Sequence, residues 1–218
     1  MIPDKDIQSW VFDLDNTLYP ASCNLFAQVD IRMRDFISNL LGLGSEDARV
    51  LQKQYFRDHG TTLRGLMTNN DIDPKPYLDY VHDIDVSPVQ PAPDLSDTLA
   101  ALPGKKYIFT NASTGHAERV MDRLGIAQHF DGIFDIVDAD YQPKPEPSIY
   151  DTFISRFNID PTKAIMVEDM ARNLKPAADL GMLSLWVETE SDWAREGANE
   201  AYVHHKTDNL LDWLKGAL

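Results

Sequence analysis

Residues 11–20 read Val-Phe-Asp-Leu-Asp-Asn-Thr-Leu-Tyr-Pro, and this stretch decides the fold. Residues 10–12 are all apolar, which predicts a short buried strand. The strand delivers two aspartates, Asp13 and Asp15, to its carboxyl end. The short polar side chains that follow favour a turn, because they can bond nearby backbone groups.

The two aspartates repel each other, so a fold that keeps both without a counter-charge is destabilised. A bound divalent cation is the simplest remedy, because hard cations prefer oxygen ligands. The alternative is a strand followed by an Asx turn whose acids are solvated. The rest of the chain has to decide between the two interpretations.

The overall charge limits the classes of partner. The 218 residues carry a formal net charge of -15, with 43% hydrophobic and 25% charged residues, as in ordinary globular proteins. Such acidity argues against binding of nucleic acid, which needs a basic surface. It does not exclude a small anionic substrate, because a metal or a local cation reverses the field inside a cleft.

The chain has one cysteine, Cys23, so an intrachain disulfide is ruled out. The first residues are polar and no apolar run is long enough to span a bilayer. We therefore expect a cytoplasmic protein, monomeric or homodimeric, that does not bind membranes.

The residues after Pro20 change to helical periodicity. We expect helices over residues 25–41, 46–57, 62–67 and 74–81, with a turn at 69–71. Asp73-Pro74 is typical of a helix start, with an N-cap and proline at the first helical position.

A proline-rich connector at residues 87–94 separates this helical block from a different pattern. Beyond it, strands predicted at 107–109, 133–137, 164–167 and 183–187 alternate with helices at 95–102, 113–124, 147–157, 174–180 and 209–214. Asn111 or Ser113 is expected to cap the second of these helices. We predict an α/β fold, a Rossmann-like parallel sheet, in which residues 1–17 and 94–218 form the core and 18–93 an all-helical insertion.

Ligands of open α/β sheets bind beyond the carboxyl ends of the strands. Four acids, Asp13, Asp15, Glu168 and Asp169, are expected to share one cleft there. Oxygen donors without a cysteine or histidine cluster indicate Mg²⁺ rather than Zn²⁺.

Groups suited to phosphate follow the other strands. The hydroxyl of Thr110 and the backbone N–H of Asn111 suit phosphate oxygens. Lys144 lies between two prolines just before a helix and supplies a positive charge. The alternative for Lys144 is an exposed lysine in a stiff loop.

In these motifs the chain resembles the phosphatases of the haloacid dehalogenase superfamily. The family's first motif, Asp-x-Asp-x-Thr, is matched by Asp13, Asp15 and Thr17, and its second by Thr110. Its third, a lysine before a helix, is matched by Lys144, and its fourth, an acidic pair, by Glu168 and Asp169. The helical insertion is similar to the family's mobile cap.

The resemblance implies a two-step mechanism. Asp13 would form an aspartyl-phosphate, and Asp15 would protonate the leaving alcohol and then deprotonate water. Thr110 and Lys144 would hold the phosphoryl oxygens. Asp13, the backbone carbonyl of Asp15, and Asp169 would hold Mg²⁺, with Glu168 behind them or acting through water. Asn173 stands where members often have a further Asp, a difference that concerns a metal-bound water or an outer contact.

Two short stretches, residues 13–20 and 60–66, are similar to pyrimidine 5′-nucleotidase-type members. A pyrimidine nucleoside 5′-monophosphate is therefore the first substrate class to expect. Candidates in the cap to meet a base or sugar are Tyr55, His59, Thr61, Thr62, Arg64 and Met67. For each of them, packing within the cap or plain surface is the alternative.

Other functions stay open. The substrate could be a sugar phosphate or another small phosphorylated metabolite, or the protein could be a phosphomutase of the same fold. A non-enzymatic acidic interaction module is a further alternative. The pair His204-His205 is interpreted as surface rather than a metal site, because no suitable acids flank it.

Overall fold

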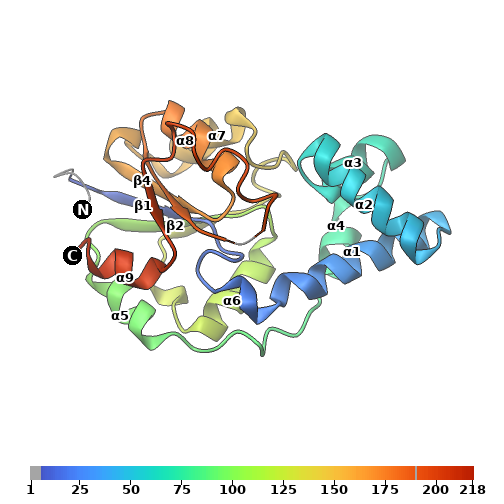
Figure 1. Ribbon diagram of the computed structural model, residues 1–218, viewed down its shortest axis with the longest axis horizontal. Coiled ribbons are helices and arrows are strands. Elements are labelled where there is room, and N and C mark those ends of the chain that lie inside the picture. Colours follow the sequence, from blue (N-terminus) through green and yellow to red (C-terminus); the bar gives the residue numbers. More distant parts are fainter. Residues whose placement is uncertain (1–5, 190) are drawn as a thin grey trace.

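A parallel β-sheet forms the centre of the α/β part of the molecule (Figure 1). The computed structural model describes residues 6–189 and 191–218. Within them the sheet has six strands in the order β3-β2-β1-β4-β5-β6, all parallel. The strands are β1 (Ser9–Phe12), β2 (Lys105–Phe109), β3 (Gly132–Phe134), β4 (Ala164–Glu168), β5 (Leu183–Val187) and β6 (His205–Thr207). The predicted fold class is confirmed.

Helices cover both faces of the sheet. In Figure 1, α7 (Pro147–Phe157) and α8 (Leu174–Asp179) lie above it, and α5 (Pro93–Ala101), α6 (Thr114–Leu124) and α9 (Leu210–Lys215) lie below it. Side chains alternate along β1 as a strand requires, with Trp10 and Phe12 in one hydrophobic cluster and Val11 in the other. Because both faces are covered, the central strands β1 and β4 are mostly apolar, with a polar residue only at one end of each, Ser9 and Glu168.

Four helices between β1 and α5 form a block beside the sheet, at the right of Figure 1. They are α1 (Leu25–Leu41), α2 (Ser45–His59), α3 (Thr62–Asn70) and α4 (Pro74–His82). Asp73 caps α4 by accepting the N–H of Lys75, as the Asp-Pro pair predicts. We call this block the cap; the division of the chain at residues 17/18 and 93/94 stays a prediction.

Two local predictions were wrong, and one strand was missed. The turn predicted at 69–71 begins later, because Asn69 and Asn70 continue α3 and only Asp71 takes a left-handed φ of 50°. The strand predicted over 133–137 ends at Phe134, because the Asp135 carboxylate accepts the N–H groups of the two residues beyond Ile136 and folds the chain. Strand β6 was not predicted at all.

A third prediction, the side-chain cap of α6, was also wrong. Ser113 occupies the N-cap position, but its hydroxyl contacts His82 Nδ1 at 2.9 Å. The N–H of Thr114 instead donates to Asp135 Oδ2 at 2.8 Å.

The strand order reverses direction at β1, since β2 and β3 lie on one side of it and β4 to β6 on the other. Parallel α/β sheets bind ligands at such a switch point, outside the carboxyl ends of the strands. Asp13 follows β1 directly, and its N–H donates to Val167 of the neighbouring β4 at 2.9 Å. The fold therefore brings the polar residues after β1, β2 and β4 to one edge.

Candidate active site

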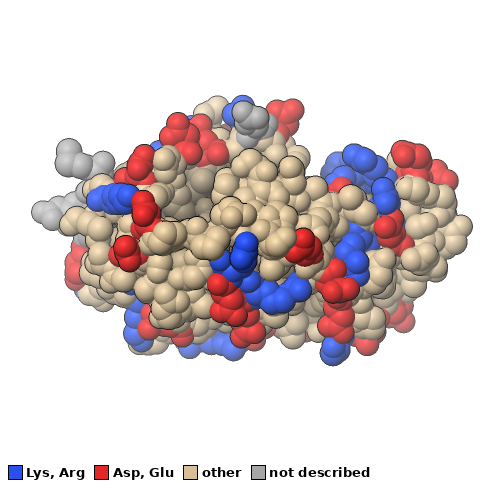
Figure 2. Space-filling view, turned by 90° about the horizontal axis from the view of Figure 1, so that it is seen from below, with Lys and Arg blue, Asp and Glu red and all other residues tan. Residues whose placement is uncertain are grey.

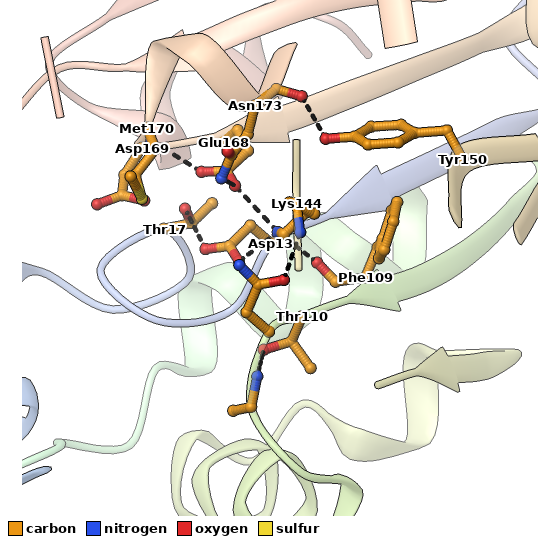
Figure 3. A network of polar contacts seen from close by, with 12 residues as sticks. Asp13, Thr17, Phe109, Thr110, Lys144, Tyr150, Glu168, Asp169, Met170 and Asn173 are labelled. Carbon is orange, nitrogen blue, oxygen red and sulfur yellow. Dashed lines mark hydrogen bonds and ion pairs between the residues drawn. The ribbon is translucent and has the colours of Figure 1, made fainter. Parts of the chain in front are cut away.

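The Asp13 carboxylate lies at the centre of the polar edge (Figure 3). Lys144 Nζ donates to Asp13 Oδ1 at 2.8 Å, and Thr17 Oγ1 donates to Asp13 Oδ2 at 2.9 Å. Lys144 also donates to the backbone oxygen of Phe109 at 2.7 Å, and its side chain is only 1% exposed. Charge-assisted bonds from two directions fix the orientation of the Asp13 carboxylate. The interpretation of Lys144 as an exposed loop lysine is therefore wrong.

Two more acids meet Asp13 at the end of β4. Carboxylate oxygens of Asp13, Glu168 and Asp169, all buried, lie within 4.8 Å of one another. Lys144 Nζ is 2.9 Å from Glu168 Oε1. The Glu168 oxygens are also engaged by the N–H of Met170 and by the Asn173 amide. These contacts engage both Glu168 oxygens, so Glu168 is better suited to a position behind a bound metal than to direct coordination of it.

The charges of this group suit a divalent cation. Burial and the charge of Glu168 raise the pKa of Asp13 to about 7, although Lys144 opposes them. Burial, Glu168 and Asp13 raise the pKa of Asp169 well above its usual range. Burial alone would lower the pKa of Lys144, but its two acidic partners raise it, so the lysine stays charged. The raised pKa values reflect that one lysine does not balance three ionised acids, and a divalent cation would supply the missing positive charge. Hard oxygen donors at this spacing fit Mg²⁺.

Thr110 and Asn111 follow β2 and line the same cavity as the acids. Thr110 Oγ1 accepts the N–H of Ala112 at 3.0 Å. Asn111 Oδ1 accepts the backbone N–H of Lys144 at 2.8 Å and so holds the loop that carries the lysine. Their predicted contact with a phosphate stays a prediction.

Asn173 has a structural explanation at the position where a further Asp was expected. Its Nδ2 donates to Glu168 Oε1 at 2.5 Å, and its backbone oxygen accepts the Tyr150 hydroxyl at 2.6 Å (Figure 3). An amide can donate to the buried Glu168, whereas an aspartate there would face it with like charge.

Asp15 lies in the same cavity but has different neighbours. Its Oδ1 accepts from Tyr19 Oη at 2.6 Å and contacts His116 Nε2 at 2.8 Å. Burial alone would raise the pKa of Asp15, but His116 and Tyr19 lower it to about 2. The Asp15 carboxylate is not part of the three-acid group, and metal binding by its backbone carbonyl stays a prediction.

Sequence reasoning missed the partners of Asp15. Tyr19 lies in the quoted opening stretch and is buried beside Asp15, four residues away. His116 belongs to the buried face of α6, and its ring stacks on His82 of α4 with 4.7 Å between centroids. The sequence signal for Tyr19 was its spacing of four residues from Asp15. The sequence signal for His116 was that a histidine lies on the apolar face of a predicted helix.

A cavity of about 570 Å³ opens from this edge toward the cap. Of the six predicted cap contacts, only Thr61 and Thr62 line it. His59 and Arg64 line a second, more polar cavity of about 340 Å³, and the Tyr55 hydroxyl is bonded to Asn70 within the cap. Most of the remaining lining is apolar, from residues that were not predicted, among them Phe26, Val29, Met33, Phe56 and Val81.

The surface in Figure 2 mixes acidic and basic side chains, and no extended basic area covers that face. That the protein does not bind nucleic acid, as its net charge predicts, stays a prediction. Within residues 6–189 and 191–218, no helix has the length and apolarity needed to cross a bilayer.

Comparisons with known proteins agree with this geometry. The family model described as haloacid dehalogenase-like hydrolase matches residues 7–181. "Phosphate metabolism protein 8" of Saccharomyces cerevisiae is 30% identical over 234 residues, spanning 99% of this chain and 72% of that protein. "Glyceraldehyde 3-phosphate phosphatase" of Methanopyrus kandleri is 25% identical over 82% of this chain and 83% of its own length. A crystal structure of a HAD phosphatase from Thermococcus onnurineus shares the fold, with a TM-score of 0.66 at 19% identity, over 97% of this chain and 98% of that one.

Proposed function

The chain belongs to the haloacid dehalogenase-like hydrolases, and within that family we propose that it is a Mg²⁺-dependent phosphomonoester hydrolase acting through an aspartyl-phosphate. One observation carries the proposal. The Asp13 carboxylate is held by Lys144 and Thr17 beside two further acids, and Asp15 lies in the same cavity. A nucleophile, a cation, a site suited to a metal and a second carboxyl group are the parts that phosphoryl transfer needs.

The first step transfers the phosphoryl group to Asp13. A carboxylate oxygen of Asp13 attacks phosphorus, and the bond between phosphorus and the alcohol oxygen breaks. In the free protein Asp15 is ionised, so we propose that the negative charge of the bound phosphate raises its pKa and that it takes up a proton as the substrate binds. Asp15 then gives this proton to the departing oxygen, and a neutral alcohol leaves. Lys144 and Thr110 bind the phosphoryl oxygens, whose charge is spread in the transition state.

The second step hydrolyses the aspartyl-phosphate. Asp15, now a carboxylate, takes a proton from water as the water oxygen attacks phosphorus. The bond from phosphorus to Asp13 breaks, which releases inorganic phosphate and restores both acids. Mg²⁺, held by Asp13, Asp169 and the carbonyl of Asp15 with Glu168 behind them, would neutralise phosphoryl charge when bound.

For the substrate we propose a nucleoside 5′-monophosphate, with a pyrimidine base first. The cavity of about 570 Å³ is within the range that holds a small organic ligand, and its cap end is mostly apolar, as suits a base or sugar. Gln52 lines it and is 1% exposed; its Oε1 has no hydrogen-bond partner among the described residues, so it is available to a donor on a ligand. The resemblance of residues 13–20 and 60–66 to pyrimidine 5′-nucleotidase-type members, noted from the sequence alone, supports the same choice.

The alternative substrate is a smaller phosphorylated metabolite. It is favoured by the name of the Methanopyrus relative, glyceraldehyde 3-phosphate phosphatase, which aligns with 82% of this chain. A phosphomutase would use the same aspartyl-phosphate but return the group to its sugar.

The test is a panel of phosphate esters with and without EDTA. Nucleoside 5′-monophosphates, sugar phosphates, glyceraldehyde 3-phosphate, phospho-amino acids and p-nitrophenyl phosphate are compared by release of inorganic phosphate, with a 2-haloacid as the control. We expect Mg²⁺-dependent phosphate release, highest with pyrimidine nucleotides. Halide release without phosphate release would overturn the proposal. Sugar-phosphate isomerisation that requires a bisphosphate would assign a mutase instead.

A further inference from the structure

His116 is a buried titratable group at this site that the proposed chemistry does not yet use. It lies in the first turn of α6 and is 2% exposed. Its Nε2 is 2.8 Å from Asp15 Oδ1, a contact between residues 101 positions apart in the sequence. The other ring nitrogen, Nδ1, is buried without a hydrogen-bond partner in the described part of the chain. Asp15 is thus the one recorded polar partner of this ring among residues 6–189 and 191–218.

The ring of His116 is held in place from the cap side. It stacks on the ring of His82, the last residue of α4, with planes 25° apart. His82 is fixed in turn by Ser113 Oγ at 2.9 Å from its Nδ1, and by Arg119, which donates to the backbone oxygen of His82. Stacking and hydrogen bonding together leave the His116 ring little freedom to turn away from Asp15.

The contact with Asp15 is directional. Nε2 of His116 carries a hydrogen in the neutral tautomer protonated there and in the imidazolium, so it donates to a carboxylate in either form. Tyr19 donates to the same oxygen, Oδ1. In the described part of the chain, both recorded hydrogen bonds of this carboxyl group therefore end on Oδ1, which leaves Oδ2 as the atom that can carry a proton to a substrate.

We propose that His116 is a positioning residue for Asp15: it fixes Oδ1 so that Oδ2 meets the leaving oxygen of the substrate. The proposal rests on the function proposed above. In the transfer step the proton moves from Asp15 Oδ2 to the alcohol oxygen as the phosphorus–oxygen bond breaks and the bond to Asp13 forms. His116 neither gains nor loses a proton; it restricts the rotation of the Asp15 carboxyl group.

The competing explanation is that His116 only packs α6 against α4. The two explanations differ in their dependence on the leaving group. An alkyl alkoxide needs a proton in order to leave, whereas p-nitrophenolate leaves without one. Loss of positioning should therefore affect alkyl phosphates selectively, whereas loss of packing affects all substrates alike.

The experiment measures kcat/KM, which reports the steps up to departure of the leaving group, for an alkyl phosphate and for p-nitrophenyl phosphate. The variants are His116→Phe, which keeps a ring but has no donor, His116→Gln, whose amide reaches as far as Nε2, and His116→Asn, which is one methylene shorter. We expect His116→Phe and His116→Asn to lose roughly 30- to 100-fold on the alkyl phosphate and less than about 3-fold on the aryl phosphate. The alkyl loss is at or below the lower end of the roughly 10²- to 10⁴-fold that general acid catalysis contributes, because Asp15 itself is retained. His116→Gln should recover most of the alkyl activity.

A second comparison uses Asp15→Asn as the background. If His116 acts through Asp15, adding His116→Phe should change kcat/KM for the alkyl phosphate no further. Equal losses on both substrates, or additive losses in the double variant, would overturn the proposal. If His116→Phe does not fold, as judged by circular dichroism, the contrast between Gln and Asn decides the question. A wild-type protein that releases no phosphate from either ester would instead refute the proposed function.

Discussion

The two ends of the cavity are built differently. At the sheet end, Asp13, Lys144, Glu168 and Asp169 form a buried charged group held by hydrogen bonds and ion pairs. At the cap end the lining is mostly apolar, and the buried Gln52 Oε1 has no partner within the described residues. The sheet end is thus organised before a ligand arrives, and the cap end is shaped to receive one. In our proposal the chemistry belongs to the first and the choice of substrate to the second.

The sharpest test of this difference removes the nucleophile. We expect Asp13→Asn to lower kcat by at least about 10³-fold on every substrate, because the aspartyl-phosphate is no longer formed. The loss is measured as release of inorganic phosphate. The variant should still fold, since it removes one of three crowded acids. Substantial activity on any ester would show that Asp13 is not the nucleophile.

Removal of the metal ion also tests the sheet end of the cavity. EDTA should lower activity roughly 10²-fold or more, and excess Mg²⁺ should restore it, because the three acids then regain a counter-charge. Mg²⁺ should also raise the Tm of the wild-type protein, since a ligand that binds only the folded state stabilises it. A Tm insensitive to Mg²⁺ would contradict the metal site.

The cap end should respond to the substrate instead. Phe26 lines the cavity and is 37% exposed, so truncating it has little cost for folding. We expect Phe26→Ala to lower kcat/KM for a nucleotide by roughly 10-fold, the scale of apolar contacts in a pocket, while p-nitrophenyl phosphate changes little. The matched control is Ile31→Ala, an exposed residue on the same helix outside the cavity lining. Equal losses on both substrates would remove the distinction between the two ends.

The smallest effect is a pH dependence of stability. The pKa of Asp13 is raised from 3.8 to about 7, so the folded metal-free protein binds a proton there more tightly than the unfolded chain does. That stability is present below pH 4 and is lost as the pH rises toward 7. The Asp13→Asn substitution removes this loss of stability at higher pH. The difference in Tm between this variant and the wild type should therefore change by on the order of 5 °C in favour of the variant between pH 5 and pH 8 in EDTA. A constant Tm difference would argue against a raised pKa.

The placement of the charged group was accessible from sequence because it depends on local rules. An apolar run followed by Asp13, or by Glu168 and Asp169, marks the end of a strand, and parallel strands place such ends at one edge. The same rules failed for β6. Residues His205–Thr207 contain no apolar side chain, and this edge strand exists through backbone pairing with β5.

The surroundings of Asp15 were not predictable in this way. The helical period of α6 marks His116 only as buried, beside Ala117 and Val120. Whether a buried histidine meets an acid 101 residues away depends on how α6 packs below the sheet. The lining of the cap cavity likewise depends on how the cap helices pack, which periodicity does not specify.

The central position of β1 has a consequence for how the chain is made. Its neighbours in the sheet are β2, which begins at Lys105, and β4, which begins at Ala164. A ribosome delivers residues 9–12 about a hundred residues before the first of these partners exists. Meanwhile the cap helices, whose contacts with one another are mostly close in sequence, can form early. The nascent protein therefore carries an unpaired apolar strand until β2 is complete at Phe109, halfway along the chain, and the charged edge is assembled only when β4 arrives.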